Sequence, residues 1–303
     1  TEYRDFDNPE FDRSNPGYDG LNVYGDEVAI TLNFDAASGL PAGTLGSAYV
    51  SRNGYNEVDL MDGYDAESAK ADFALHYRPF ANDLEIVLNS KFGNGNTIYQ
   101  GTNRYNINNF FMQQHKLEIK GDNFFVRGYI TDEDAADSYD SRFAAININR
   151  SWKSDTQWFT EYAQTYIGGR LGMIPGMPML DDASAHNLAR QVARTGALVP
   201  GTEAFKTAFD KVISNPNLGT GAKFQDKSKI YHTDANYNFG DAIDFADIQV
   251  GGSWRQYSLN SSGTIFTDYD GPIKYEEYGA YTQLQKKFVD DRLKFTGSLR
   301  YDK

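Results

Sequence analysis

Hydrophobic and polar residues alternate along much of the chain from residue 67 onward. The segment KLEIKGDNFFVRGYI, residues 116–130, shows the pattern most clearly. Because successive side chains on a β-strand point to opposite faces, this segment predicts two strands joined by a short turn at 121–123. One face of the hairpin is polar, and the other carries Leu117, Ile119, Phe124, Val126, Gly128 and Ile130. The apolar face must meet either the core of a soluble sandwich or lipid.

The same pattern recurs and predicts about ten strands, grouped into hairpins with short turns. The predicted strands are 67–78, 84–92, 112–120, 124–131, 142–150, 156–166, 229–239, 245–257, 277–287 and 292–301. The joins between successive hairpins are longer, at 93–111, 132–141, 167–228 and 258–276. A meander with short turns at one end and long loops at the other is typical of an outer-membrane barrel.

The polar face favours the same fold class, because charged side chains are costly in a dry core and are accepted by a water-filled lumen. The charged positions on the predicted polar faces include Lys70, Asp72, His76, Arg78, Lys116, Glu118, Lys120, Arg127, Arg255 and Arg300. The pattern therefore predicts an all-β protein, an antiparallel transmembrane β-barrel in which the strands occupy 67–166 and 229–303.

Two segments outside the strands, residues 1–66 and 167–228, are predicted to be large extracellular loops. The elements expected within them are a small hairpin of 28–34 with 45–50, and helices over about 183–195 and 203–214, the second capped by Thr202. These helices either fold the loop compactly or form a lid over a binding cavity.

Composition excludes several functions. The chain carries 29 basic and 42 acidic residues, a net charge of −13, and lacks the basic patch that nucleic acid requires. It has no cysteine, which excludes disulfides, thiolate metal sites and a thiol nucleophile. No apolar run approaches the roughly 20 residues of a membrane helix. The 21 Tyr and 20 Phe suit interfacial girdles, but they also suit a β sandwich or a sugar-binding surface.

No catalytic constellation is present, so we expect no enzyme activity and no cofactor. Neither an HExxH nor a GxSxG motif occurs, and the four histidines are dispersed. The acidic stretch TDEDAADSYD supplies weak calcium candidates, Asp132, Asp134 and Asp137, although its spacing lacks the EF-hand pattern. A solvated charge run is the alternative interpretation.

Ordered blocks of the sequence resemble the barrel of TonB-dependent outer-membrane receptors of the Bacteroidota type. The blocks are NPGYDGLNVYGDEV, ESAKADFALHYR, KLEIKGDNFFVRGYITDEDAADSYDSRFAAININRSWKSD and YEEYGAYTQLQKKFVDDRLKFTGSLRYDK. The resemblance implies a barrel of roughly 22 strands, an N-terminal plug domain and a TonB-contacting segment. Because the plug and the remaining strands are not visible here, we expect residues 1–303 to be the central portion of a longer polypeptide.

The resemblance also implies a function in the Gram-negative outer membrane, the import of a glycan, a peptide or a metal chelate. The ligand cavity would be shared by the external loops, the upper lumen wall and the plug, and a surface lipoprotein is an expected partner. Aromatic rings with hydroxyl or guanidinium neighbours make Tyr139, Arg142, Trp254, Arg255 and Tyr257 the candidate ligand-binding residues. Trp254 falls on the predicted lipid-facing side, so an interfacial anchor is its alternative role.

Two other functions fit the pattern. One is a structural or adhesive surface protein that keeps the barrel and binds partner proteins through its loops. The other is a secreted soluble β protein that binds carbohydrate, in which the apolar faces would pack sheet on sheet.

Overall fold

The computed structural model describes residues 23–101 and 103–303, and they form two compact units. The helical unit contains residues 23–64, 98–106 and 139–223. The sheet unit contains residues 65–97, 107–138 and 224–303. Residues 1–22 of the predicted extracellular loop lie outside the described residues.

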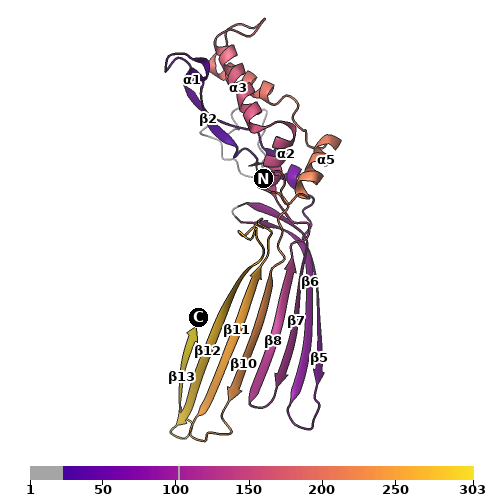
Figure 1. Ribbon diagram of the computed structural model, residues 1–303, viewed down its shortest axis with the longest axis vertical. Coiled ribbons are helices and arrows are strands. Elements are labelled where there is room, and N and C mark those ends of the chain that lie inside the picture. The colour runs from indigo at the N-terminus through magenta and orange to yellow at the C-terminus, as the bar shows by residue number, and fades with distance from the viewer. Residues whose placement is uncertain (1–22, 102) are drawn as a thin grey trace. The chain divides into compact units, whose positions relative to one another are not determined.

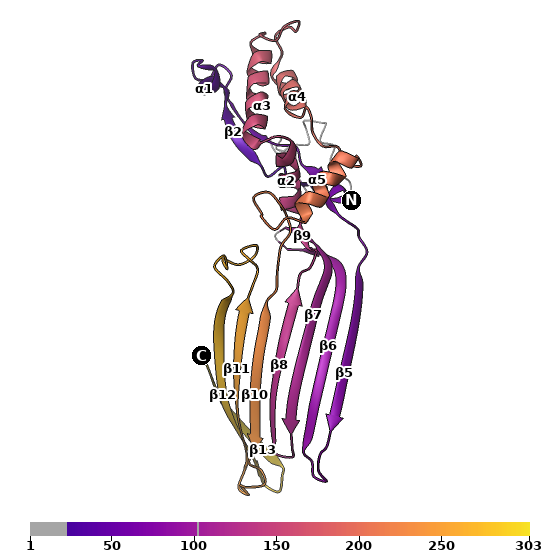
Figure 2. The same ribbon diagram turned by 45° about the vertical axis from the view of Figure 1, so that its right-hand side comes forward.

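The sheet unit is built on one antiparallel sheet with the strand order β13-β12-β11-β10-β8-β7-β6-β5 (Figures 1 and 2). Neighbours in the sheet are consecutive in the chain, except that a long insertion separates β8 from β10. The strands are β5 (Glu67–Tyr77), β6 (Glu85–Gln100), β7 (Arg104–Lys120), β8 (Phe124–Asp134), β10 (Lys229–Asn238), β11 (Asp247–Leu259), β12 (Ile273–Phe288) and β13 (Leu293–Asp302). Eight of the ten predicted strands are thereby confirmed, six of them to within four residues at each end, whereas β6 and β7 are each longer by eight residues at one end.

The connections at one end of this sheet are short, as predicted. They span residues 78–84, 121–123, 239–246 and 289–292. At the opposite end the chain leaves the sheet between β8 and β10, and residues 260–272 join β11 to β12. The predicted long join over 93–111 is wrong, because β6 and β7 continue through most of it and only 101–103 separate them.

The strands predicted over 142–150 and 156–166 are also wrong, because these residues form the helices α2 (Ser141–Trp152) and α3 (Asp155–Arg170). Local caps explain where the helices begin. The Asp140 side chain accepts hydrogen bonds from the backbone N–H groups of the second and third residues of α2, and Ser154 Oγ accepts one from the Gln157 N–H. Asp and Ser are among the residues most favoured at this position.

The spacing of the buried residues in α3 is also helical. Trp158, Tyr162 and Tyr166 recur every fourth residue and are all buried. Residues four apart lie on one face of a helix. They also lie on one face of a strand, because four is a multiple of the strand period of two. The spacing of these three residues therefore fits both structures.

The helical unit combines these helices with the two segments predicted as loops. Its elements are β1 (Val23–Tyr24), β2 (Ala29–Asn33), α1 (Phe34–Ser38), β3 (Ser47–Ser51), β4 (Tyr55–Asn56), η2 (Glu57–Leu60), β9 (Tyr139–Asp140), α2, α3, α4 (Asp182–Ala193) and α5 (Glu203–Ile213). The predicted hairpin is confirmed as β2 and β3, and both predicted helices are confirmed as α4 and α5, with Thr202 as the N-cap of α5. Among the described residues, no helix is both long enough and apolar enough to cross a membrane.

Two apolar clusters hold the helical unit together. In the first, Phe34 and Val50 pack with Trp158 of α3 and with the small residues Ala185 and Ala189 of α4. In the second, residues of the N-terminal segment pack with α2 and α5, including Tyr55, Leu60, Ala144, Ile148, Phe205 and Phe209. The N-terminal segment and the 139–223 insertion therefore share one core instead of forming separate loops.

Buried cations connect this core to the backbone. The Arg52 guanidinium donates hydrogen bonds to Asp155 Oδ1 at 2.6 Å and to the Lys153 carbonyl at 3.0 Å. Arg190 donates to the Ser51 carbonyl at 3.0 Å, and burial lowers its pKa to about 10. Both guanidinium carbons lie 5.9 Å from the centroid of the Trp158 ring, where cation–π attraction adds to the hydrogen bonds.

The loop of the sheet unit between β11 and β12 is organised by one buried carboxylate. Asp268 accepts hydrogen bonds from the backbone N–H groups of Ser261, Ser262 and Gly263. It also accepts one from Ser261 Oγ, at 2.6 Å. Burial alone raises the pKa of a carboxyl group, but these donors outweigh it and lower the pKa of Asp268 to about 2.

Replacing Trp158 by alanine should destabilise the helical unit by about 3–5 kcal/mol, because the change leaves a cavity and removes the ring beneath two buried cations. Hydrogen exchange of the α3 amides measures this local stability. The matched control, Leu171→Ala at an exposed position, should change it by no more than about 0.5 kcal/mol. Equal effects of the two substitutions would contradict the packing described.

The Asp268 carboxylate should stabilise its loop above the unfolded pKa of roughly 3.9, and this stabilisation should be lost as the pH falls toward 2. Asp268→Asn should accelerate exchange of the Ser261–Gly263 amides about tenfold or more at neutral pH. Asp270→Asn, at an exposed position of the same loop, is the control and should leave the exchange unchanged. A loop that exchanges at the same rate in both variants would show that the carboxylate does not organise it.

Candidate ligand-binding face

The sheet has a polar face and an apolar face, each defined by the strand register. Paired residues of antiparallel strands share a face, so the pairs Glu118–Arg127 and Arg127–Asp234 place these charges together. The polar face comprises Asp72, His76, Asn89, Lys91, Lys116, Glu118, Arg127, Tyr129, His232, Asp234, Arg255, Tyr257, Tyr275, Glu277 and Arg300. The apolar face carries Phe73, Leu75, Leu88, Leu117, Ile119, Val126, Ile130, Val250, Trp254, Phe295 and Leu299. It also carries a few polar residues, among them Gln256 and Glu276.

Arg127 links two carboxylates near the middle of the polar face. Its Nε lies 2.7 Å from Asp234 Oδ1, and its Nη1 lies 3.9 Å from Glu118 Oε2. Lys116 Nζ approaches the same Glu118 oxygen at 3.2 Å. Charges of opposite sign thus alternate across β7, β8 and β10.

Arg255 continues the network toward β12. Its Nε donates to His232 Nδ1 at 3.4 Å, and its Nη1 donates to Tyr257 Oη at 3.0 Å. Nη1 also lies 3.3 Å from Glu277 Oε2. Three partners on three strands therefore hold the guanidinium against the sheet.

Aromatic rings lie among these charges. The rings of Tyr129 and His232 are 4.8 Å apart between centroids, and those of Tyr257 and Tyr275 stack at 4.5 Å. Hydrogen-bond donors, acceptors and flat rings on one surface are the groups that hold polar ligands in place. This part of the polar face is the candidate site.

The apolar face is open, and the polar face is closed only near the middle of the sheet. On the apolar face, Leu117 is 47% exposed and Leu299 is 73% exposed. On the polar face, the side chains of Glu118 and His232 are 13% and 10% exposed. On the outer strands both faces are open, since the Arg300 side chain is 60% exposed. The unusual feature is the long row of large exposed apolar side chains on one face, which is rare on the surface of soluble proteins.

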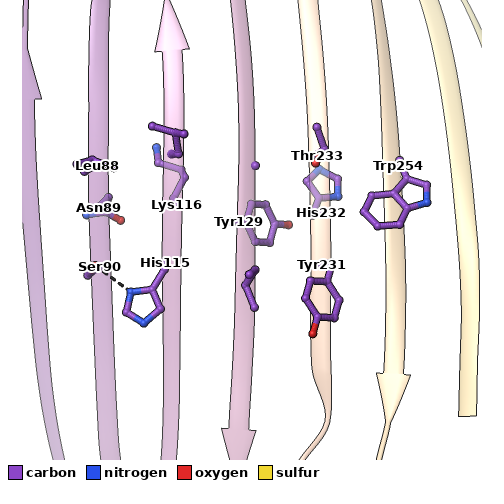
Figure 3. Close-up of a pocket in the computed structure, with 13 residues that line it drawn as sticks. Leu88, Asn89, Ser90, His115, Lys116, Tyr129, Tyr231, His232, Thr233 and Trp254 are labelled. Atoms are coloured by element: carbon purple, nitrogen blue, oxygen red, sulfur yellow. Dashed lines mark hydrogen bonds between the residues drawn. The ribbon is translucent and has the colours of Figure 1, made fainter. Parts of the chain in front are cut away.

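Two of the five predicted ligand-binding residues come together in this site. Arg255 and Tyr257 lie on the polar face of β11 and share a hydrogen bond. Trp254 lies between them in sequence but on the apolar face, as its alternation predicts. Figure 3 shows Trp254 on β11, beside Tyr231 and Thr233 of β10.

The other two predicted residues, Tyr139 and Arg142, belong to the helical unit. Tyr139 is fully buried; its hydroxyl donates to the Leu60 carbonyl at 2.9 Å, and burial raises its pKa. Arg142 is in the first turn of α2, with its Nε 3.6 Å from Glu27 Oε1. Both side chains thus make structural contacts within that unit, and neither belongs to the polar face.

The calcium candidates have cationic or amide partners instead of one another. Asp132 Oδ2 lies 3.1 Å from Lys229 Nζ, and Asp134 Oδ2 lies 3.4 Å from Lys227 Nζ. Asp137 accepts a hydrogen bond from the Asn109 side chain at 3.1 Å. Across residues 23–101 and 103–303, no group of three or more His, Asp or Glu residues is arranged to hold a metal ion.

Sequence reasoning did not select the partners of Arg255 as site residues. His232 pairs directly with Arg255 across β10 and β11, and Glu277 pairs with it across β11 and β12. The sequence does place His232 and Glu277 among the polar residues of the strands on either side of Arg255. Aligning the strands requires the register, which the alternating pattern alone leaves open by two residues in either direction.

The apolar face carries a shallow depression of about 430 Å³ lined by Gly128 (Figure 3). His115 and Ser90 border it and are joined by a 2.9 Å hydrogen bond. Tyr231 and Trp254 border its other side. The alternation places Ser90, His115, Tyr231 and Trp254 on the face opposite to the charged network, although Lys116, Tyr129 and His232 of the polar face also line the depression.

A scan against protein-family models finds no match to this chain, and a search of curated proteins finds no significantly similar sequence.

The ion pair of Arg127 and Asp234 should contribute about 1 kcal/mol to the free energy of unfolding, measured as the coupling energy in a double-mutant cycle of Arg127→Met and Asp234→Asn. The value is small because an ion pair in contact with water adds little to stability. Urea unfolding in detergent micelles, followed by tryptophan fluorescence, measures it. The matched control is Arg300 with Asp302, a more exposed pair 2.7 Å apart, which should couple less strongly. A loss of about 3–5 kcal/mol for each single substitution would instead indicate a dry core.

Proposed function

We propose that this chain forms part of the β-barrel of a TonB-dependent outer-membrane transporter, which imports a nutrient into the periplasm. The nutrient is a glycan, a peptide or a metal chelate. The exposed apolar face, opposite a face of paired charges, is the observation that carries the proposal. An apolar face that is open to its surroundings suits lipid, and a face of paired charges suits a wet lumen.

The arrangement of the connections supports the same conclusion. Short turns gather at one end of the sheet, and the long connections, 135–228 and 260–272, leave the sheet at the other end. Outer-membrane barrels have short periplasmic turns and long extracellular loops. In the proposed orientation the turns 78–84, 121–123, 239–246 and 289–292 face the periplasm.

The free edges of the sheet bear on the size of the barrel. Within the described residues, β5 and β13 each have only one neighbouring strand. Open edges leave backbone groups unpaired, and each unpaired group costs several kcal/mol in lipid. We propose that further strands of the complete polypeptide pair with both edges, which yields a closed barrel of roughly 22 strands.

A surface lipoprotein partner would contact the helical unit. The segment 171–181 of the helical unit, between α3 and α4, exposes Met173, Met177 and Met179. Methionine side chains are flexible and polarizable, and they are common on surfaces that adapt to partners. We propose this segment as the partner contact. TonB would act through segments outside this chain.

The soluble carbohydrate-binding alternative requires a second sheet to cover the apolar face. The described residues of the sheet unit contain one sheet only, and its apolar face is exposed. The alternative of an adhesive surface protein has the same barrel but transports no nutrient. A measurement of nutrient uptake therefore distinguishes the adhesive protein from the transporter.

A host strain that lacks the complete protein should fail to take up at least one nutrient, which then remains in the growth medium. Mass spectrometry of the spent medium measures this. A strain lacking TonB should leave the same compound, because import depends on energy from the inner membrane. Uptake that continues without TonB would contradict the proposed mechanism.

Within the site, Arg255→Gln should lower the uptake of that compound about tenfold without changing the amount of protein at the surface. Arg300→Gln is the matched control: it removes the same charge from the polar face of β13, outside the Arg255 network, and should have a much smaller effect. Equal loss in both variants would show that net charge, not the Arg255 network, determines uptake.

A further inference from the structure

The helical unit contains a groove between α2 and α5 that is separate from the polar face of the sheet. It has a volume of about 650 Å³, which is within the range of pockets that hold small organic molecules. Its lining residues include Arg150 and Trp152 of α2, Leu198, and Ala208, Lys211 and Val212 of α5. All of them belong to the helical unit, so the groove is a feature of that unit alone.

The groove combines an apolar surface with a positive charge. Its charged lining residues, Arg150 and Lys211, are both cations. Arg150 Nε is 2.8 Å from Asp155 Oδ2 and is thereby partly neutralised. Lys211 has no ion pair among the described residues, although the neighbouring Lys206 pairs with Asp210 at 2.6 Å. An anionic group is the ligand chemistry that Lys211 favours.

A buried polar atom lies in the same wall. Asn147 is a lining residue that is almost fully buried, and its Nδ2 donates to the carbonyls of Leu218 and Gly221. Its Oδ1 has no hydrogen-bond partner within the described part of the chain. Buried polar atoms normally have a partner, so a hydrogen-bond donor is expected at this point of the wall. A carboxylate has only acceptor oxygens, so it pairs with Lys211 and not with this amide oxygen.

We propose that the α2–α5 groove binds a small organic carboxylate. The apolar body of the ligand packs against Trp152, Leu198 and Val212, and its carboxylate pairs with Lys211. The inference does not rest on the transport proposal, because it uses only contacts within the helical unit.

The experiment is calorimetric titration of the complete protein in detergent micelles with 2-naphthoate, after subtraction of the heat from empty micelles. The uncharged isostere 2-naphthamide tests the contribution of the carboxylate. We expect saturable binding of 2-naphthoate and binding of the amide that is roughly fivefold weaker. No saturable heat with 2-naphthoate, or equal affinity for the two compounds, would overturn the proposal.

Three variants locate the binding. Lys211→Met should weaken 2-naphthoate roughly fivefold and leave 2-naphthamide unchanged. Lys206→Met removes the same charge from the same helix outside the groove and should have no effect. Ala208→Trp fills the groove and should abolish binding of both compounds, with far-ultraviolet circular dichroism showing that the helices remain. Equal weakening by Lys206→Met and Lys211→Met, or unchanged binding to a folded Ala208→Trp variant, would refute a site in this groove.

Discussion

The backbone hydrogen-bond ladder from β5 to β13 is the constraint on which the sheet unit depends. Its register decides which side chains share a face, because a slip of one residue exchanges the two faces of a strand. In the observed register, Glu118, Arg127, Asp234 and Arg255 lie on one side, while Leu117, Val126 and Trp254 lie on the other. This pairing separates the charged side chains from the apolar ones. The proposal that one face meets lipid and the other meets water follows from that separation.

The helical unit obeys a different constraint, the burial of aromatic and cationic groups in one core. Trp158 lies between apolar neighbours and the guanidinium groups of Arg52 and Arg190. Each guanidinium donates to backbone carbonyls of segments distant in sequence, which fixes β3 and the residues that follow it against the helices. Because a buried guanidinium left without its partners is costly, these bonds specify one arrangement of the unit. The N-terminal segment therefore folds with the 139–223 insertion.

The sheet was largely predictable because its signal is local: a period of two, bounded by Gly, Asp and Asn turns. The helix α5 was predictable from its cap, Thr202, and from the apolar stripe of Phe205, Phe209 and Val212. The strands predicted over 142–150 and 156–166 are helices instead, because the caps Asp140 and Ser154 begin helices there, although Ala144, Ile146 and Ile148 alternate as in a strand. Of the candidate site, Arg255 and Tyr257 were predicted from residue type. His232 and Glu277 required the register, and the burial of Tyr139 required tertiary contacts that no local pattern encodes.

The most direct test is the accessibility of spin labels along β7, measured by electron paramagnetic resonance in lipid bilayers. The chain contains no cysteine, so each substitution introduces one reactive thiol into it. Labels at Leu117 and Ile119 should be accessible to oxygen and shielded from a water-soluble nickel complex, and labels at Lys116 and Glu118 should show the opposite. If both sets are equally accessible to the nickel complex, the apolar face does not meet lipid, and the proposed barrel and transport function would have to be abandoned.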